Sequence, residues 1–326
     1  MRQAATWSKS ASAVAGQTLL PITSRTAKAC PLCGGTCGDV EYRWREYKWN
    51  VCASCRAWLL DAVPEDLSLA YPDEYFGGDT AKFTGPAGWA RTHFHRGRAA
   101  RIRRMLSGGV SLYDIGCGDG LFLAEAKALG FAVAGCEPEE KPRLQAEQRA
   151  GAAVSKEMFA PPSGSAYDAI TCWQVIEHID NPSLLFREAR SRLKSGGIFA
   201  ISTVNVGSWQ ARLFKQAWLH ADPPRHLWCG TMNGVEQLLQ KEGFVVESRR
   251  SNWMEFGPVG WVSSSLNVTG CDRDILVQRL KSGFRGVADP VFWASALLSP
   301  VGTVLAGIEA AVGCPATFEL YCRYNG

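Results

Sequence analysis

Short apolar segments alternate with longer amphipathic ones along most of the chain beyond about residue 90. The apolar segments have the length and composition of strands, and the segments between them have the periodicity of helices. We expect strands at SLYDI (111–115), FAVAGCE (131–137), YDAITCW (167–173), GIFAIST (197–203), FVVES (244–248) and FELYCRY (318–324). We expect helices at 119–129, 139–150, 182–193 and 231–242.

Strand, helix and strand at this spacing indicate right-handed crossovers and a parallel sheet with helices on both faces. The predicted fold class is therefore α/β, a doubly wound Rossmann-like sheet. In such sheets a ligand lies outside the carboxyl ends of the strands, next to the first one. The loop after residue 115 is the place to look for a binding site.

The first sixty residues follow a different pattern. Residues 1–27 contain Arg2, Lys9 and Arg25 but no acid and no continuous apolar stretch, so we expect a disordered tail rather than a secretory signal. An organelle transit peptide is the alternative. We divide the remainder into a cysteine-rich module at 28–60, a linker at 61–89, and a main domain at 90–326 whose residues 250–316 form a helical cover. A chain of 326 residues has room for this arrangement.

Five of the twelve cysteines fall within residues 30–55. CPLC (30–33) and CASC (52–55) each bring two thiolates to one edge of a tetrahedron, and a hairpin between them completes four ligands. We predict a zinc ribbon with Cys30, Cys33, Cys52 and Cys55 as ligands and Cys37 as a bystander. Scattered remaining cysteines indicate a reducing, cytoplasmic compartment rather than a disulfide framework. The zinc either staples a segment too small to fold alone or docks a substrate.

The loop after the first strand of the main domain reads DIGCGDG (114–120). Its glycine spacing differs from the G-x-G-x-x-G of a dinucleotide site, although an NAD-binding domain is the alternative. Asp114 would repel a pyrophosphate but suits a cation such as S-adenosylmethionine, which carries an ammonium, a sulfonium and no phosphate. Glu137 ends the next strand, where an acid can accept both ribose hydroxyls of an adenosine.

Four motifs resemble those of the class I S-adenosylmethionine-dependent methyltransferases. SLYDIGCGDGLF is similar to their first motif, and CEPEE to their acidic second-strand motif. YDAITCWQVIEHIDNP and LKSGGIFAIST resemble their fourth-strand and fifth-strand motifs. The resemblance covers residues from about 90 to 250, and it implies conversion of S-adenosylmethionine to S-adenosylhomocysteine.

The resemblance also implies roles for individual positions. Asp114, Gly116 and Gly118 match residues near the methionine part of the cofactor, and Glu137 matches the ribose ligand. The remaining matches are Met158 and Phe159, which enclose the adenine, and Trp173 and Gln174, which lie beside the transferable methyl. An acid often bonds the adenine amino group in this family, and Glu157 is the one nearby candidate.

Two histidines are candidate catalytic residues. Methyl transfer from a sulfonium is an in-line displacement, and a hydroxyl acceptor must also lose its proton. His178 follows Glu177 after the fourth strand, and His226 lies in ADPPRHLWCGT (221–231), a segment typical of a bacterial branch of these enzymes. Some quinone-precursor methyltransferases hold a divalent metal with an acid at position 174 and this Glu-His pair. Because Gln174 lacks that charge, we predict no catalytic metal. The alternative is that both histidines only stabilise their loops.

Two further segments allow two interpretations each. RTHFHRGRAARIRR (91–104) contains six arginines and forms either a solvated helix face or a phosphate-binding face. Residues 290–308 carry no charge for nineteen positions. That length approaches a membrane span. Because Pro300 lies at its centre, we expect two packed helices instead, covering the sheet edge or lining an acceptor pocket, and no span.

We therefore expect a methyltransferase with S-adenosylmethionine and a structural Zn²⁺ as cofactors. Its acceptor is expected to be a small molecule or a sugar or glycan, with surface polysaccharide biosynthesis as the context suggested by analogy. An RNA base methyltransferase is a second interpretation, disfavoured by a net charge of only +4. A zinc-dependent binding protein with a vestigial cofactor pocket is a third, disfavoured by the intact Asp114, Gly116, Gly118 and Glu137. The sequence does not determine the oligomeric state.

Overall fold

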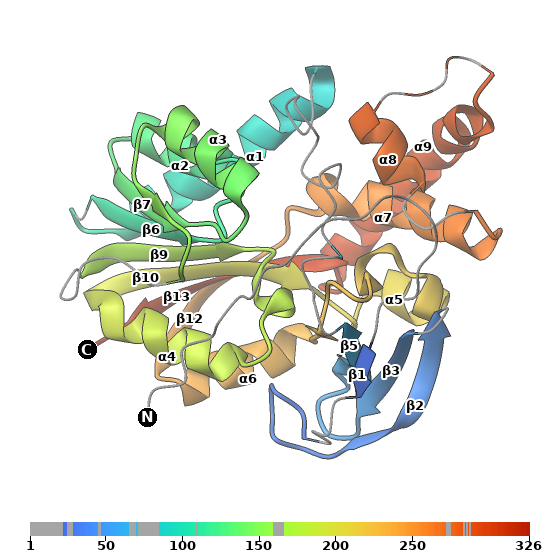
Figure 1. Cartoon of the computed structure of the whole chain (residues 1–326), viewed down its shortest axis with the longest axis horizontal. Coiled ribbons are helices and arrows are strands. Elements are labelled where there is room, and N and C mark those ends of the chain that lie inside the picture. Colours follow the sequence, from blue (N-terminus) through green and yellow to red (C-terminus); the bar gives the residue numbers. More distant parts are fainter. Residues whose placement is uncertain are drawn as a thin grey trace.

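The computed structural model describes residues 22–24, 29–44, 47–64, 70, 85–108, 110–158, 166–271, 275–282, 284, 286 and 288–326. Most of the expected N-terminal tail and linker lies outside these residues. The described part contains a main α/β domain and a small sheet formed largely by the cysteine-rich segment, joined along one side (Figure 1).

The main domain is built on a seven-stranded sheet with the order β12-β13-β10-β9-β6-β7-β8. Its strands are β6 (Ser111–Ile115), β7 (Ala132–Cys136), β8 (Val154–Ser155), β9 (Tyr167–Trp173), β10 (Leu193–Val204), β12 (Phe244–Arg250) and β13 (Thr317–Tyr324). All six predicted strands are present, and the α/β fold class is confirmed. The sheet is mixed, because β13 runs antiparallel to both β10 and β12.

Helices cover both faces of this sheet (Figure 1). On one face lie α1 (Gly85–Met105), α2 (Leu121–Ala128) and α3 (Glu140–Ala150). On the other lie α4 (Pro182–Arg192) and α6 (Met232–Lys241). Both begin at side-chain caps, since Asn181 accepts from the Leu184 N–H and Thr231 from the Gly234 N–H. The four helices predicted between strands are confirmed to within two residues at each end.

The cysteine-rich segment forms the predicted hairpin. β2 (Cys37–Trp44) pairs with β3 (Tyr47–Cys52), and β4 (Trp58–Leu60) extends the sheet. A fourth strand, β11 (Trp228–Cys229), comes from the main domain and pairs with β4. The small sheet is therefore not an independent unit, because the segment that carries His226 leads directly into it.

Two boundaries differ from the sequence prediction. Ile22–Ser24, assigned to the tail, forms β1 and pairs with β5 (Ala62–Pro64), assigned to the linker. Both segments contain β-branched residues, and a partner distant in the sequence is enough to order them as strands. The first helix of the main domain, α1, begins at Gly85, within the segment assigned to the linker.

The C-terminal cover consists of α7 (Trp253–Val268), α8 (Ile275–Ser282) and α9 (Pro290–Ala311). The prediction of two helices at 290–308 was wrong, because α9 continues through Pro300. Packing along α7 holds the helix together there: Gly302 lies against Trp261, and Ala306 lies against Gly257. Within the described chain, α9 is the one helix long and apolar enough to cross a membrane.

Candidate functional site

The glycine loop turns sharply where β6 ends. Gly116 and Gly118 have φ angles of 68° and 56°, in the left-handed region that favours glycine. A Cβ on Gly116 would lie 2.6 Å from Cγ2 of Val175, so no larger residue fits without displacement. The N–H of Gly118 donates to Oε2 of Glu137 at 3.0 Å. The loop is thus tied to the acid that ends the neighbouring strand.

Glu137 is buried at the carboxyl end of β7. Its Oε1 accepts from the N–H of Glu139 at 3.0 Å, while Oε2 accepts from Gly118. A carboxylate has about four acceptor positions, and these two bonds orient the group beside the loop. The geometry suits the recognition of a diol beside the loop.

Asp114 is buried at the end of β6 and accepts from Oγ1 of Thr171 at 2.6 Å. Burial raises the pKa of its carboxyl to about 8, while the Thr171 hydroxyl and the Arg98 charge act in the opposite direction. A cationic ligand beside this group favours its ionised form.

A cavity of about 590 Å³ opens at this edge of the sheet. That volume is typical of a small-molecule site. Its walls include Asp114, Gly116, Gly118 and Glu137, together with Met158, Trp173, Gln174, His178 and His226. Phe159 lies outside the described residues, and Glu157 is exposed and does not line the cavity. The structure therefore brings the predicted loop, ribose, methyl and histidine positions into one site.

Contacts with Ser202 and Arg98 restrain Gln174 and Trp173. Gln174 has a φ of 55°, and both its N–H and its Nε2 donate to Oγ of Ser202 at 3.1 Å. The Cζ atom of Arg98 lies 5.0 Å from the centroid of the Trp173 ring, over its face. These contacts keep the wall between β9 and β10 rigid and direct the Gln174 amide toward Ser202.

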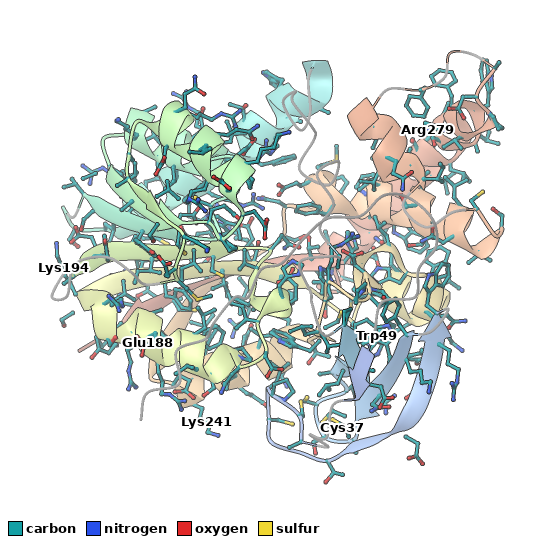
Figure 2. The ribbon with its side chains drawn as sticks, viewed as in Figure 1. Cys37, Trp49, Glu188, Lys194, Lys241 and Arg279 are labelled. Atoms are coloured by element: carbon teal, nitrogen blue, oxygen red, sulfur yellow. The ribbon has the colours of Figure 1, made fainter. Side chains whose placement is uncertain are left out.

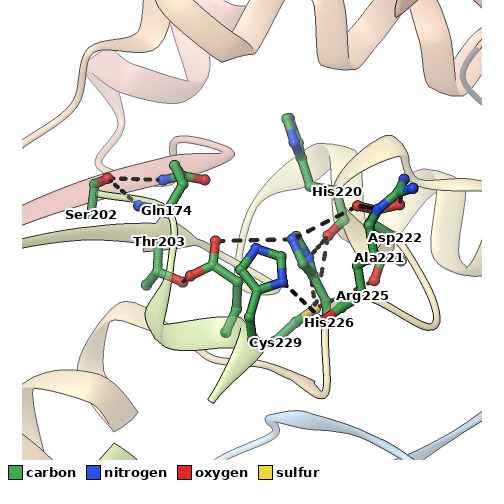
Figure 3. A network of polar contacts seen from close by, with 11 residues as sticks. Gln174, Ser202, Thr203, His220, Ala221, Asp222, Arg225, His226 and Cys229 are labelled. Carbon is green, nitrogen blue, oxygen red and sulfur yellow. Dashed lines mark hydrogen bonds and ion pairs between the residues drawn. The ribbon is translucent and has the colours of Figure 1, made fainter. Parts of the chain in front are cut away.

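Glu177, His178 and His226 form a buried cluster in the same cavity. One donor atom from each lies within 4.8 Å of the other two. The ring centroids of the histidines are 4.8 Å apart, and Nε2 of His226 is 4.0 Å from Oε1 of Glu177. Figure 3 shows His226 beside Asp222 and Arg225, which form an ion pair within the same loop. By its donor atoms the cluster suits either proton transfer or a divalent ion.

The hydrogen bonds of the two histidines define their tautomers. Nδ1 of His226 contacts the carbonyl of His220 at 2.8 Å, and Nδ1 of His178 contacts the carbonyl of Arg225 at 2.9 Å. A carbonyl only accepts, so both Nδ1 atoms carry the proton, and Nε2 of the neutral His226 presents a lone pair. Burial and the neighbouring His178 lower the pKa of His226 to about 3, and burial lowers that of His178. Both rings are therefore neutral near pH 7.

Glu177 carries the negative charge of this cluster. Its Oε2 accepts from Oγ1 of Thr203 at 2.9 Å, whereas its buried Oε1 has no hydrogen-bond partner among the described residues. Burial raises the pKa of this carboxyl to about 7. An unpartnered carboxylate oxygen 4.0 Å from Nε2 of His226 can stabilise positive charge at this point.

The arginine segment fits the solvated-face interpretation only in part, because Arg96 and Arg104 are exposed whereas Arg98 is buried. Arg98 is fully buried and bonds Glu319 at 2.7 Å and Glu255 at 2.5 Å. Arg91 bonds Asp119 of the glycine loop, and Arg149 does so from α3. The predicted solvated face is thus wrong for Arg98, which supports the cavity wall. No local sequence signal identifies Arg98, because both of its partners lie more than 150 positions away.

The four predicted zinc ligands come together in the small sheet. The Sγ atoms of Cys30 and Cys55 are 3.5 Å apart, as are those of Cys33 and Cys52, and all four lie within 4.8 Å of one another. Cys37 lies outside this group, on the strand opposite Cys52 (Figure 2). Burial raises the pKa of Cys52, but N–H donors from Cys55 and Ser54 outweigh it and lower the pKa to about 7. A set of four thiols at these distances fits a structural Zn²⁺.

The cysteine-rich module contacts the loop that bears His226. Oγ1 of Thr231 donates to the carbonyl of Cys55 at 3.2 Å, and the N–H of Leu60 donates to the carbonyl of Leu227 at 3.0 Å. Leu32 packs within reach of Gly230. No residue of the described module lines the cavity. The module therefore supports the back of the loop rather than the site itself.

Known proteins share this sequence pattern. Residues 91–249 match a family model described as a methyltransferase domain. The ubiquinone biosynthesis O-methyltransferase of Paramagnetospirillum magneticum is 35% identical over 124 residues, which cover 35% of this chain and 49% of that protein. The ubiquinone biosynthesis O-methyltransferase of Cereibacter sphaeroides is 31% identical over 193 residues, covering 54% of this chain and 74% of that protein. The chain thus spans about half the length of the first relative and about three quarters of the second.

Among solved structures, the cyclopropane synthase MmaA2 from Mycobacterium tuberculosis matches with a TM-score of 0.48. It is 17% identical in sequence, and the match covers 70% of this chain and 83% of that chain.

Proposed function

Because the chain belongs to the class I S-adenosylmethionine-dependent methyltransferases, we propose that it methylates a hydroxyl oxygen of an acceptor held beside His226. The observation that carries this proposal is the neutral imidazole, which shares one cavity with the glycine loop. The intact loop and its bond to Glu137 argue against a vestigial pocket.

We assign the cofactor to the glycine-loop end of the cavity. Gly116 and Gly118 allow the backbone to approach the methionine part, and the buried Asp114 favours a cation there. Glu137 is placed to bind the ribose, and Met158 to contact the adenine. We assign Trp173 and Gln174, which line the same cavity, to the surroundings of the methyl group. When bound, the cofactor supplies an electrophilic methyl on a sulfonium, and the protein aligns the acceptor with it.

We assign the acceptor to the end of the cavity lined by the cluster Glu177, His178 and His226. His226 presents an unprotonated Nε2 that can take the hydroxyl proton as the oxygen attacks. The carboxylate of Glu177, 4.0 Å away, stabilises the imidazolium that forms. His178 is a positioning residue, because its ring packs edge-on against His226.

A small-molecule acceptor is favoured by the relatives, whose names describe O-methylation in ubiquinone biosynthesis. The sugar or glycan acceptor, and with it a part in surface polysaccharide biosynthesis, rests on fold-level analogy alone. The described structure also gives an RNA acceptor little support, because Arg91 and Arg98, two of the six arginines of α1, are engaged by acids of the protein itself.

The acceptor class can be tested with the purified full chain, S-adenosylmethionine and two panels of compounds, simple phenols and simple glycosides. We expect S-adenosylhomocysteine release and a methyl ether product with at least one phenol, identified by mass spectrometry. Turnover confined to the glycosides would instead support the glycan interpretation. A product methylated on a ring carbon rather than on a hydroxyl oxygen would contradict an oxygen acceptor.

Replacement of Glu137 by Gln tests the cofactor assignment. The amide keeps the size of the side chain but loses the charge and turns one acceptor into a donor that faces the Gly118 N–H. Each hydrogen bond to a charged group contributes roughly 1.5–3 kcal/mol. We therefore expect the affinity for S-adenosylhomocysteine, measured by calorimetry, to fall by roughly ten- to a hundredfold.

Glu140→Gln is the matched control, because Glu140 is exposed in the first turn of α3 and does not line the cavity. It should bind S-adenosylhomocysteine like the wild type. Unchanged binding in Glu137→Gln, or binding of NAD to the wild type, would contradict the cofactor assignment.

We further propose that Cys30, Cys33, Cys52 and Cys55 hold one structural Zn²⁺. The module contacts Gly230, Thr231 and Leu227 of the loop that carries His226. These contacts favour a structural role, in which the zinc stabilises the module that supports this loop. They do not favour a role as a docking surface for the acceptor.

A further inference from the structure

The C-terminal cover forms part of the cavity. Six of its residues line the space: Met254, Glu255, Phe256 and Val259 of α7, and Val277 and Leu280 of α8. We call these six residues the cover wall. All of them follow residue 249, the last position that matches the methyltransferase family model. The cover wall therefore belongs to a part of the chain that the shared domain does not define.

The cover wall borders the loop that carries His226. The ring of Phe256 meets the ring of His220 edge-on, with the two centroids 6.2 Å apart. The carbonyl of His220 in turn accepts from Nδ1 of His226 at 2.8 Å. α7 packs closely at this point, because a Cβ on Gly260 would lie 2.9 Å from Nε2 of His220. Phe256 and the wall around it therefore lie at the acceptor end of the cavity.

The cover wall offers apolar surface and no free polar group. Five of its six side chains are apolar. The sixth, Glu255, accepts from Nη1 and Nη2 of Arg98 at 3.1 and 2.5 Å, so its carboxylate is already engaged. A sugar held against this wall would bury hydroxyls that the wall cannot satisfy, and each such hydroxyl costs free energy. Hydrocarbon has no such cost and gains from leaving water.

Packing fixes the α8 part of the wall against α7. Leu276 of α8 is buried in one cluster with Val262 and Leu266 of α7. Nε of Arg279 donates to Oδ2 of Asp289, the cap of α9, at 2.8 Å. A wall that is held in this way can bind a ligand without first being ordered, which favours affinity.

The cover wall extends from the interior of the cavity to the protein surface. Met254 is 50% exposed and Leu280 41% exposed, whereas Phe256 and Val259 are more enclosed. A group bound along the wall can therefore reach solvent at the rim. The wall sets no sharp limit on the length of that group.

We propose that the cover wall binds an apolar substituent of the acceptor, so that the substrate is a phenol or alcohol with a hydrocarbon group of several carbons. This inference rests on the proposed function, because it takes the reacting hydroxyl to lie beside His226. The methyltransferase domain then supplies the chemistry, and the C-terminal cover selects the acceptor. Val277 and Leu280 are specificity-determining residues in this arrangement, and glycans are excluded by the lack of polar partners.

A series of para-alkylphenols, from phenol to para-hexylphenol, tests the cover wall. Calorimetry measures their binding to the full chain saturated with S-adenosylhomocysteine, and mass spectrometry measures their methylation by S-adenosylmethionine. We expect each CH₂ that contacts the wall to raise the affinity by about fourfold, until the chain passes the rim. The value of kcat/KM should rise in the same proportion.

The double variant Val277→Thr/Leu280→Gln makes the α8 part of the wall polar. We expect it to lower the ratio of the affinities for para-hexylphenol and phenol by about tenfold or more. The matched control is Leu144→Gln/Val245→Thr, which makes the same changes at exposed positions of α3 and β12 that do not line the cavity. The control should keep the ratio of the wild type. Circular dichroism checks that each variant is folded.

The outcomes separate this inference from the proposed function. Affinities that do not rise with chain length in the wild type would overturn the cover wall, even where phenols are methylated. So would an unchanged ratio in Val277→Thr/Leu280→Gln, or an equal loss in the control, because the alkyl group would then bind elsewhere. Affinities that rise with chain length and fall in the α8 variant, without any methyl ether product, would support the cover wall and contradict the proposed methylation of oxygen.

Discussion

Replacement of His226 by Asn is expected to lower the turnover number by about a hundred- to ten-thousandfold, the usual contribution of a general base. The Asn amide can still donate toward the His220 carbonyl that Nδ1 contacts, but it cannot take a proton from the acceptor. The affinity for S-adenosylhomocysteine should stay the same, because His226 lies at the acceptor end of the cavity. Steady-state kinetics with the acceptor found in the panels, together with calorimetry, measure the two quantities separately.

The pH profile gives the same assignment a second test. The pKa of Glu177 is raised by burial to about 7, so its carboxylate forms only as the pH rises through this value. The ionised group lies 4.0 Å from Nε2 of His226 and favours the imidazolium, which makes the imidazole a stronger base. Turnover should therefore rise through about pH 7. Glu177→Gln should turn over more slowly and flatten the profile.

Two results would contradict a general base at this position. One is an unchanged turnover number in His226→Asn. The other is an activity that a chelator of divalent ions abolishes and Mg²⁺ restores, which would assign Glu177, His178 and His226 to a metal. His93→Asn is the control, because His93 is exposed on α1 and does not line the cavity.

The sequence predicts the parts of the site that depend on neighbouring residues. β6 and β9 are short apolar runs bounded by turn residues, and the loop between β6 and α2 needs glycine at Gly116 because Val175 leaves no room for a side chain. The two Cys-x-x-Cys pairs are equally local. Each of these features appears as a pattern within a few positions, and the structure places each of them where the pattern predicts.

Features that depend on distant contacts were not predictable in this way. Arg98 lies in a run of arginines that looks solvated, yet it is buried because Glu255 and Glu319 arrive from α7 and β13 to neutralise it. β11 joins the sheet of the cysteine-rich module only because the loop at 221–231 folds back onto β4. Pro300 would normally end a helix, and its tolerance in α9 depends on the contact with α7. In each case a long-range partner overrides the local signal.

Replacement of Cys52 by Ser is expected to remove the metal from the protein. Ser offers a poor ligand at neutral pH, and the remaining three thiols no longer close a tetrahedral site. Structural zinc contributes about 10–16 kcal/mol of apparent binding free energy in small zinc domains, much of it used for folding. Elemental analysis should show about one zinc per chain in the wild type and none in Cys52→Ser. Cys37→Ser is the control and should keep the zinc, because Cys37 lies outside the ligand group.

The effect of losing the metal should extend beyond the module. β4 pairs with β11, and Cys55 accepts a bond from Thr231, so a disordered module withdraws support from the loop that carries His226. We therefore expect Cys52→Ser to lower the turnover number while the protein still binds S-adenosylhomocysteine, because no described residue of the module lines the cavity. Full zinc occupancy in Cys52→Ser would refute the ligand set. Normal turnover in a zinc-free variant would instead show that the loop keeps its position without the module. The hydrogen bonds of Leu227 and Trp228 to the main-domain carbonyls of Glu177 and Ile179 would then be sufficient to hold it.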